Sequence, residues 1–181
     1  MEGIVMKTKL IFLLSCFIIG ALNAQNSKFF SIDSTYSTRI FLDPKGVQID
    51  KSVPLLGHYS FDANEKFIQE LLKIYKETFG DIDEEIKTAL FRGGQVTFFF
   101  DKNLHIYYFQ FGFSKQYSPI ILGIEDKLFE FAERFKKIDL SIFIEIQNKE
   151  TFQNAPLMVL FGCIINYDKH PEKFHAEKIF Y

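Results

Sequence analysis

The stretch QVTFFFDKNLHIYYFQFGF, from Gln95 to Phe113, holds eight aromatic residues and constrains the fold more than any other part of the chain. It divides at Asp101–Asn103 into two runs of strand-forming residues, which predicts a β-hairpin. Successive side chains of a strand point to opposite faces of the sheet. The first strand therefore has two sets of side chains, Val96, Phe98 and Phe100 on one face and Thr97 and Phe99 on the other.

The second strand of this hairpin alternates in the same way. Its two predicted sets are Ile106, Tyr108 and Gln110 on one face and His105, Tyr107, Phe109 and Phe111 on the other. Both faces of the hairpin are largely apolar, so one side is expected to pack on helices and the other beneath the N-terminal segment or a partner. Burial is the favoured reading because Phe is mostly a core residue. If the stretch binds instead, the set that contains His105 and Tyr107 is the candidate partner surface.

Two helical segments are predicted before the hairpin. In residues 62–79, Asp62 and Glu65 have the spacing of a capping box, and Gly80 can end the helix in a left-handed cap. The apolar residues recur at helical spacing and predict one buried face, made of Phe67, Ile68, Leu71, Leu72, Tyr75 and Phe79. DEEIKTALFRGG predicts a short second helix, closed by Gly93 and Gly94.

After the hairpin, one long helix is predicted within residues 118–139. Its apolar residues alternate at spacings of four and three, in the series Ile124, Leu128, Phe131, Phe135 and Ile138. SIFIEIQN is compatible with a short strand, and LMVLFGCIINY is predicted to be a strand covered on both faces because its apolar run is continuous.

The segment before residue 62 is more polar and less patterned. Asp43 to Gly46 fits a type I turn with Pro44 at its second position, which predicts a small hairpin. We expect this segment to be an N-terminal arm or an extra ribbon laid on the domain. The fold class is α+β: helix, two-strand hairpin, helix and strand form a small, mostly antiparallel sheet with its helices on one face. The predicted organisation is a leader over 1–24, the arm or hairpin over 25–60, and one domain over 61–181.

The order of these elements resembles the C-terminal domain of TonB and TolA-type envelope proteins. The resemblance lies in GGQVTFFFDKNLHIYYFQF, a glycine-led strand, turn and strand, followed by the long helix and LMVLFGCII. It covers about 70 residues, is topological, and implies an envelope location and a fold rather than an activity. The chain departs from the family in lacking a proline-rich spacer and in placing Asn103 and Leu104 where the turn usually carries glycine.

The N-terminus predicts export. MKTKLIFLLSCFIIGALNAQ has two lysines, 13 apolar or small residues from Leu10 to Leu22, and Ala24 before Gln25, as in a secretory signal peptide. The apolar run is shorter than the roughly 20 residues that span a bilayer, so no lasting transmembrane span is expected. Translation from Met1 or from Met6 would both give this signal. LLSC also resembles a lipobox, so a lipid anchor on Cys16 is the minority alternative to a free periplasmic or extracellular protein. With a leader ending in AQ, the chain is also similar to small secreted proteins of Bacteroidetes bacteria.

Composition restricts the partners. The predicted leader holds Lys7, Lys9 and Glu2, so the 21 basic and 23 acidic residues become 19 and 22, a net charge of −3. This balance argues against nucleic acid or an anionic membrane as partner. Only Cys163 would remain of the two cysteines, so no internal disulfide is expected. The 23 phenylalanines can supply the core instead, at roughly 1.5–3 kcal/mol for each buried side chain.

Motifs with catalytic or ligand-binding chemistry are weak in this sequence. His170 and His175 stand five apart, which does not place them on one helical face, so they and Cys163 are not expected to bind zinc. The acidic residues Asp81, Asp83, Glu84 and Glu85 lack the pattern of a calcium loop. No G-x-S-x-G, H-E-x-x-H or phosphate-binding loop is present. We therefore predict no catalytic, cofactor or metal residues, and no cofactor.

Two functions remain as hypotheses. The first is a non-enzymatic module that pairs with an envelope protein by adding a strand to a sheet edge. The second is a small-molecule binder or an unrecognised enzyme, with a pocket between the aromatic sheet and a helix.

Overall fold

The computed structural model describes residues 27–47, 49 and 55–171 and has the predicted α+β fold. Its main sheet is antiparallel, with strand order β1-β2-β5-β4-β7. These strands are β1 (Phe30–Asp33), β2 (Arg39–Pro44), β4 (Gln95–Asp101), β5 (Ile106–Ser114) and β7 (Asn154–Leu160). Strands β3 (Tyr59–Phe61) and β6 (Ile144–Ile146) pair in a separate two-stranded sheet. The predicted leader, Cys16 and His175 lie outside the described residues.

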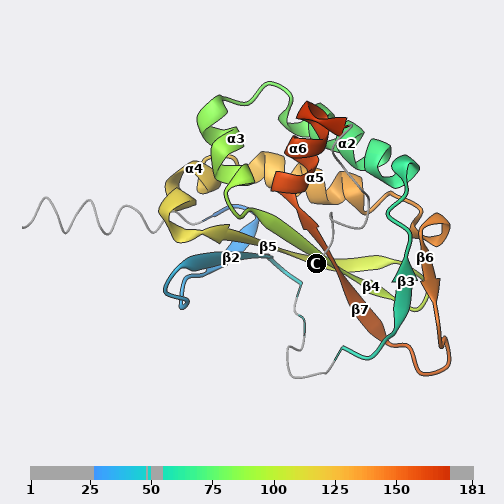
Figure 1. Cartoon of the computed structure of the whole chain (residues 1–181). Coiled ribbons are helices and arrows are strands. Elements are labelled where there is room, and N and C mark those ends of the chain that lie inside the picture. Colours follow the sequence, from blue (N-terminus) through green and yellow to red (C-terminus); the bar gives the residue numbers. More distant parts are fainter. Residues whose placement is uncertain (1–26, 48, 50–54, 172–181) are drawn as a thin grey trace, which may run out of the picture.

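The helices cover one face of the main sheet (Figure 1). They are α2 (Glu65–Phe79), α3 (Glu84–Phe91), α4 (Ser118–Leu122), α5 (Glu125–Phe135) and α6 (Phe161–Lys169). Two short 3-10 turns, η1 (Lys115–Tyr117) and η2 (Leu140–Ile142), precede α4 and β6. The opposite face of the sheet has no described helix on it, so the main core lies between the sheet and the helical layer.

Phenylalanine side chains fill this core. Val96, Phe98 and Phe100 are fully buried on the helical side of β4, as their alternation predicts. The ring of Phe98 stacks on that of Phe135 in α5, with centroids 3.9 Å apart and planes at 9°. The prediction that the aromatic stretch buries one of its faces is confirmed.

The β4–β5 hairpin contains an irregularity that alternation alone does not reveal. Its register shifts between Phe99, which pairs with Tyr108, and Phe100, which pairs with Ile106. Tyr107 is thus an extra residue in β5, as in a β-bulge. Because Ile106 pairs with Phe100, its side chain lies on the helical face of the sheet, whereas Tyr108 pairs with Phe99 on the other face, so the predicted placement of Ile106 on one face with Tyr108 is wrong.

Helix α2 buries all six residues of its predicted apolar face. Its caps differ from prediction. The N-cap is Asn64, whose side chain accepts a hydrogen bond from the Phe67 N–H (3.0 Å), while the carboxylate of Asp62 accepts one from the Asn64 amide (3.1 Å). Gly80 has φ −55°, a right-handed conformation rather than the predicted left-handed cap. The short helix before Gly93 is confirmed as α3.

The long helix predicted within residues 118–139 is two helices, α4 and α5. They are separated by Gly123 and by Ile124, whose φ of −119° is not helical. The apolar spacing continues across the break, since Ile121, Leu128, Phe131 and Phe135 all face the core. A periodic pattern therefore locates the buried face but misses the change of direction.

The apolar run LMVLFGCIINY contains both a strand and a helix, so its prediction as one strand is wrong. Strand β7 ends at Leu160, where it pairs with Gln95 at the start of β4. Beyond this point β4 offers no further partner, and the Phe161 N–H donates to the carbonyl of Gly94 instead (3.1 Å). The following residues form α6, which buries Phe161, Ile164, Ile165 and Tyr167.

The N-terminal segment contributes β1 and β2 to the main sheet. Strand β2 pairs with β1 on one side and with β5 on the other. Both sides of β2 are therefore occupied, and the hairpin predicted across Asp43–Gly46 is wrong. Gly46 does lie in a turn, with φ +80°, where glycine is favoured.

Candidate functional site

The four residues of the candidate partner surface do not share one surface. Phe109 is 3% exposed and Phe111 0%, and both face the helices, so they belong to the core. Tyr107 is 39% exposed at the bulge, and His105 is exposed in the loop before β5. Because the bulge displaces Tyr107 from the alternation, the structure separates the two exposed residues from the two buried phenylalanines.

The other residues that the sequence singled out also lie apart. Cys163 is half-buried on α6, and burial raises the pKa of its thiol, which disfavours the reactive thiolate. His170 follows α6, and Asp83 is the N-cap of α3. Within residues 27–47, 49 and 55–171, no three His, Cys, Asp or Glu side chains are grouped to hold a metal ion. In the same part of the chain, no helix has the length and apolar character to cross a bilayer.

The outer edge of β1 is the first candidate site. The Lys45 N–H donates to the carbonyl of Phe29 (2.8 Å), which fixes the direction of the backbone groups in β1. Since these groups alternate along an antiparallel strand, those of Ser31 and Asp33 point to β2, whereas those of Phe30 and Ile32 point outward. The Phe30 N–H binds the Ser27 hydroxyl (2.9 Å).

Ile32 is the most accessible point of this edge. Its N–H and C=O point away from β2, and none of the described residues pairs with them. Its side chain is 38% exposed. Proteins usually protect such an edge with proline, a charged side chain or a bulge. The sequence of β1, FSID, has no proline, and its one charged residue is Asp33, whose carboxylate accepts hydrogen bonds from the N–H (3.0 Å) and the hydroxyl (2.7 Å) of Thr35.

The edge at the other end of the sheet, on β7, is obstructed. The Asn154 N–H donates to the carbonyl of Leu56 (3.3 Å), and the Tyr59 hydroxyl donates to the carbonyl of Pro156 (2.6 Å). Pro156 has no N–H to offer. A partner strand cannot pair along the length of β7 without displacing these contacts, so the two edges differ in their capacity to bind.

The face of the sheet opposite the helices carries a small polar cluster. The carboxylate of Asp43 on β2 accepts hydrogen bonds from the Tyr108 hydroxyl and from the Gln110 amide on β5, the latter at 2.7 Å. Burial, and then the bond to Asp43, raises the pKa of Tyr108 above its ordinary value, so the phenol remains protonated as a donor. The cluster joins β2 to β5 and thereby links the paired strands β1 and β2 to the rest of the sheet.

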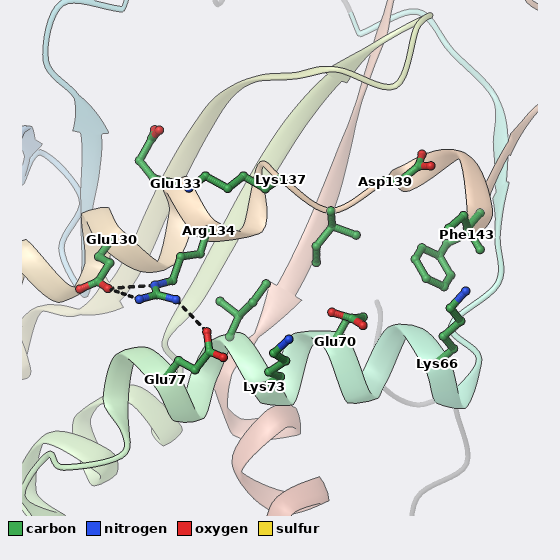
Figure 2. Close-up of a pocket in the computed structure, with 13 residues that line it drawn as sticks. Lys66, Glu70, Lys73, Glu77, Glu130, Glu133, Arg134, Lys137, Asp139 and Phe143 are labelled. Atoms are coloured by element: carbon green, nitrogen blue, oxygen red, sulfur yellow. Dashed lines mark hydrogen bonds and ion pairs between the residues drawn. The ribbon is translucent and has the colours of Figure 1, made fainter.

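A groove of about 750 Å³ lies between α2 and the segment formed by α5 and η2 (Figure 2). Its apolar lining consists of Ile74, Ile138, Ile142 and Phe143, and its rims are charged. Arg134 closes one end by donating to Glu77 across the groove (2.7 Å) and to Glu130 on its own helix (2.8 Å).

Three lysines along this groove, Lys66, Lys73 and Lys137, make no ion pair with another described residue. Hydrogen bonds from Ser141 lower the pKa of Asp139, the acidic residue near the far end. No Ser, Thr, Cys or His lines the groove. The groove therefore offers ion pairs and apolar contact to a ligand, and its lining residues include no hydroxyl, thiol or imidazole nucleophile.

The space between the aromatic sheet and the helices, where the sequence suggested an alternative pocket, is filled by side chains. The ring of Phe161 lies 5.2–6.3 Å from four other rings, those of Phe79, Phe111, Phe113 and Phe131. Phe67 makes similar contacts with Phe61, Phe135 and Phe143. Because these rings fill the space between the sheet and the helices, the core offers no support for a ligand pocket there.

Sequence reasoning missed both the β1 edge and the groove. The edge arises because β2 pairs with β5, some 70 residues away, and no local pattern encodes that pairing. The α2 residues that line the groove include Lys66, Glu70, Lys73 and Glu77, and charges of alternating sign along a helix are by themselves typical of a solvated face. Searches against protein-family models, curated proteins and solved structures found no match for this chain.

Proposed function

We propose that this protein is an exported, non-enzymatic interaction module that binds a partner by adding a strand to the outer edge of β1. The observation that carries the proposal is the orientation of Ile32, whose N–H and C=O both point outward and are unpaired among the described residues. Main-chain hydrogen bonds supply affinity in strand addition, and an apolar side chain beside the edge supplies contact.

The expected location of the protein also supports this proposal. The leader-like N-terminus and the resemblance to TonB and TolA-type domains both favour the cell envelope as the location. The obstructed β7 edge favours one binding edge for each molecule, rather than two. We propose an envelope protein as the partner.

Photo-crosslinking in the producing cells tests this function. A benzoyl-phenylalanine placed at Ile32 retains the backbone N–H and brings a reactive group to the edge. Tyr107 is the matched control position, because it is exposed to nearly the same extent, 39% against 38%, but lies on the β4–β5 hairpin. We expect a discrete adduct from position 32 and little or none from position 107.

Two results would contradict the proposal. One is the absence of an adduct at position 32, and the other is adducts of equal yield and identity at both positions, which would indicate nonspecific contact. Mass spectrometry of the adduct identifies the captured chain.

A further inference from the structure

Resting on the proposed function, we infer that the strand received at the β1 edge is β1 of a second copy of this chain. The proposal concerns an isologous contact, in which the same residues meet across a two-fold axis. Two copies of β1 would pair antiparallel, and their sheets would join into one continuous sheet.

The direction of the backbone groups selects the register. With the axis at Ile32, the N–H of each Ile32 donates to the carbonyl of the other, which places a reciprocal pair of hydrogen bonds on the axis. With the axis at Ser31, Phe30 would oppose Ile32, and the Phe30 N–H already binds Ser27. The register centred on Ile32 uses groups that have no described partner.

The side chains of β1 also fit this register. Ser31 would lie opposite Asp33 of the second copy, in a pair without main-chain hydrogen bonds, where side chains approach most closely. The Oδ1 atom of that carboxylate already accepts hydrogen bonds from the N–H (3.0 Å) and the hydroxyl (2.7 Å) of Thr35. The Ser31 hydroxyl can add a further hydrogen bond to the same carboxylate, and the contact occurs twice by symmetry. The exposed Ile32 side chains meet on the axis and become shielded from water.

The difference between the two sheet edges limits the assembly to two copies. If β7 were as open as β1, copies could add from edge to edge and form a filament. Pro156 and the contacts of Leu56 and Tyr59 oppose that growth. The edge of β1 has only four residues, so we expect a weak dimer whose population depends on concentration.

Sedimentation analysis of the purified protein over the micromolar to millimolar range tests the dimer. We expect a monomer–dimer equilibrium with no larger species. Ile32→Pro removes the outward N–H and should weaken dimerisation roughly tenfold or more, since both hydrogen bonds on the axis are lost. Proline is tolerated on an edge strand where the N–H faces solvent, so the fold should persist, as a melting curve can verify.

Two further variants separate the edge from unrelated effects. Ile32→Val keeps the N–H and a β-branched side chain and should dimerise as the unmodified protein does. Ile32→Lys keeps the N–H but places two positive charges together on the axis, so it should weaken dimerisation even if Ile32→Pro fails to fold.

The outcomes distinguish this inference from the proposed function. A monomer at every concentration, with position 32 still capturing a different protein, overturns the second copy and leaves strand addition standing. A dimer insensitive to Ile32→Pro and Ile32→Lys also overturns the inference, because its contact lies elsewhere. If position 32 gives no adduct and the dimer is insensitive to both substitutions, then strand addition at β1 and the pairing of two copies through β1 are both overturned.

Discussion

Phe98→Ala is expected to lower the free energy of unfolding by about 3–5 kcal/mol, the usual cost of truncating a buried aromatic side chain. Phe98 is fully buried, and its ring stacks on Phe135, so the substitution leaves a cavity between β4 and α5. Denaturant unfolding followed by circular dichroism measures the loss. Phe109→Ala should behave similarly, because Phe109 faces the same core.

Two neighbouring positions provide controls for this prediction. Phe99 has the same side chain on the face opposite the helices, where it is only half-buried, so Phe99→Ala should cost clearly less than Phe98→Ala. Tyr107→Ala should cost below about 1.5 kcal/mol, within the range of ordinary substitutions. Near-normal stability of Phe98→Ala, combined with loss of partner binding, would contradict the placement of this aromatic face in the core.

Phe161→Ala is expected to have an effect of the same size, a loss of about 3–5 kcal/mol. Phe161 is the first residue of α6, and its fully buried ring contacts rings from α2, β5 and α5. Truncation removes the side chain at which the sheet and three helices meet. Thermal and denaturant unfolding should both shift, and they should remain cooperative.

Phe91→Ala is the matched control for Phe161→Ala. Phe91 ends the neighbouring helix α3 and is 41% exposed, so its truncation should stay below about 1.5 kcal/mol. Equal losses in the two variants would show that Phe161 is not the central core residue that its ring contacts indicate.

The parts of the fold that the sequence predicted correctly are those with a strong local period. Helix α2 repeats its apolar residues every three or four positions, and buried residues alternate with half-buried ones along β4. In each element, this period predicts which face is buried. The fold class followed from the order of these elements.

The end of β7 could not be predicted, because LMVLFGCIINY is apolar throughout and has neither a strand period nor a helix period. The strand ends where its neighbour β4 begins, at Gln95, and this limit depends on tertiary structure rather than on the local sequence. The bulge at Tyr107 could not be predicted either. It is a shift in the pairing between β4 and β5, and no change in the run of strand-forming residues marks its position.

The candidate site was less accessible to sequence reasoning than the fold. That reasoning suggested a sheet edge in general terms, but it placed the surface on Phe109 and Phe111, which pack against Phe30 and other rings in the core. Finding the β1 edge requires knowing which side of each strand is already paired. Pairing between β2 and β5 depends on residues far apart in the chain, and local propensity does not specify it.

Amide hydrogen exchange at Ile32 tests the central claim, that β1 receives a strand, most directly. The exchange rate is measured by NMR in the isolated monomer and in the assembly with the chain that position 32 captures. Ser31 and Asp33 are internal references, because their N–H groups point to β2 in both states. We expect the Ile32 amide to exchange roughly tenfold more slowly or better in the assembly, with Ser31 and Asp33 changing little. An Ile32 amide that exchanges equally fast in both states would contradict strand addition, even if the partner remains bound.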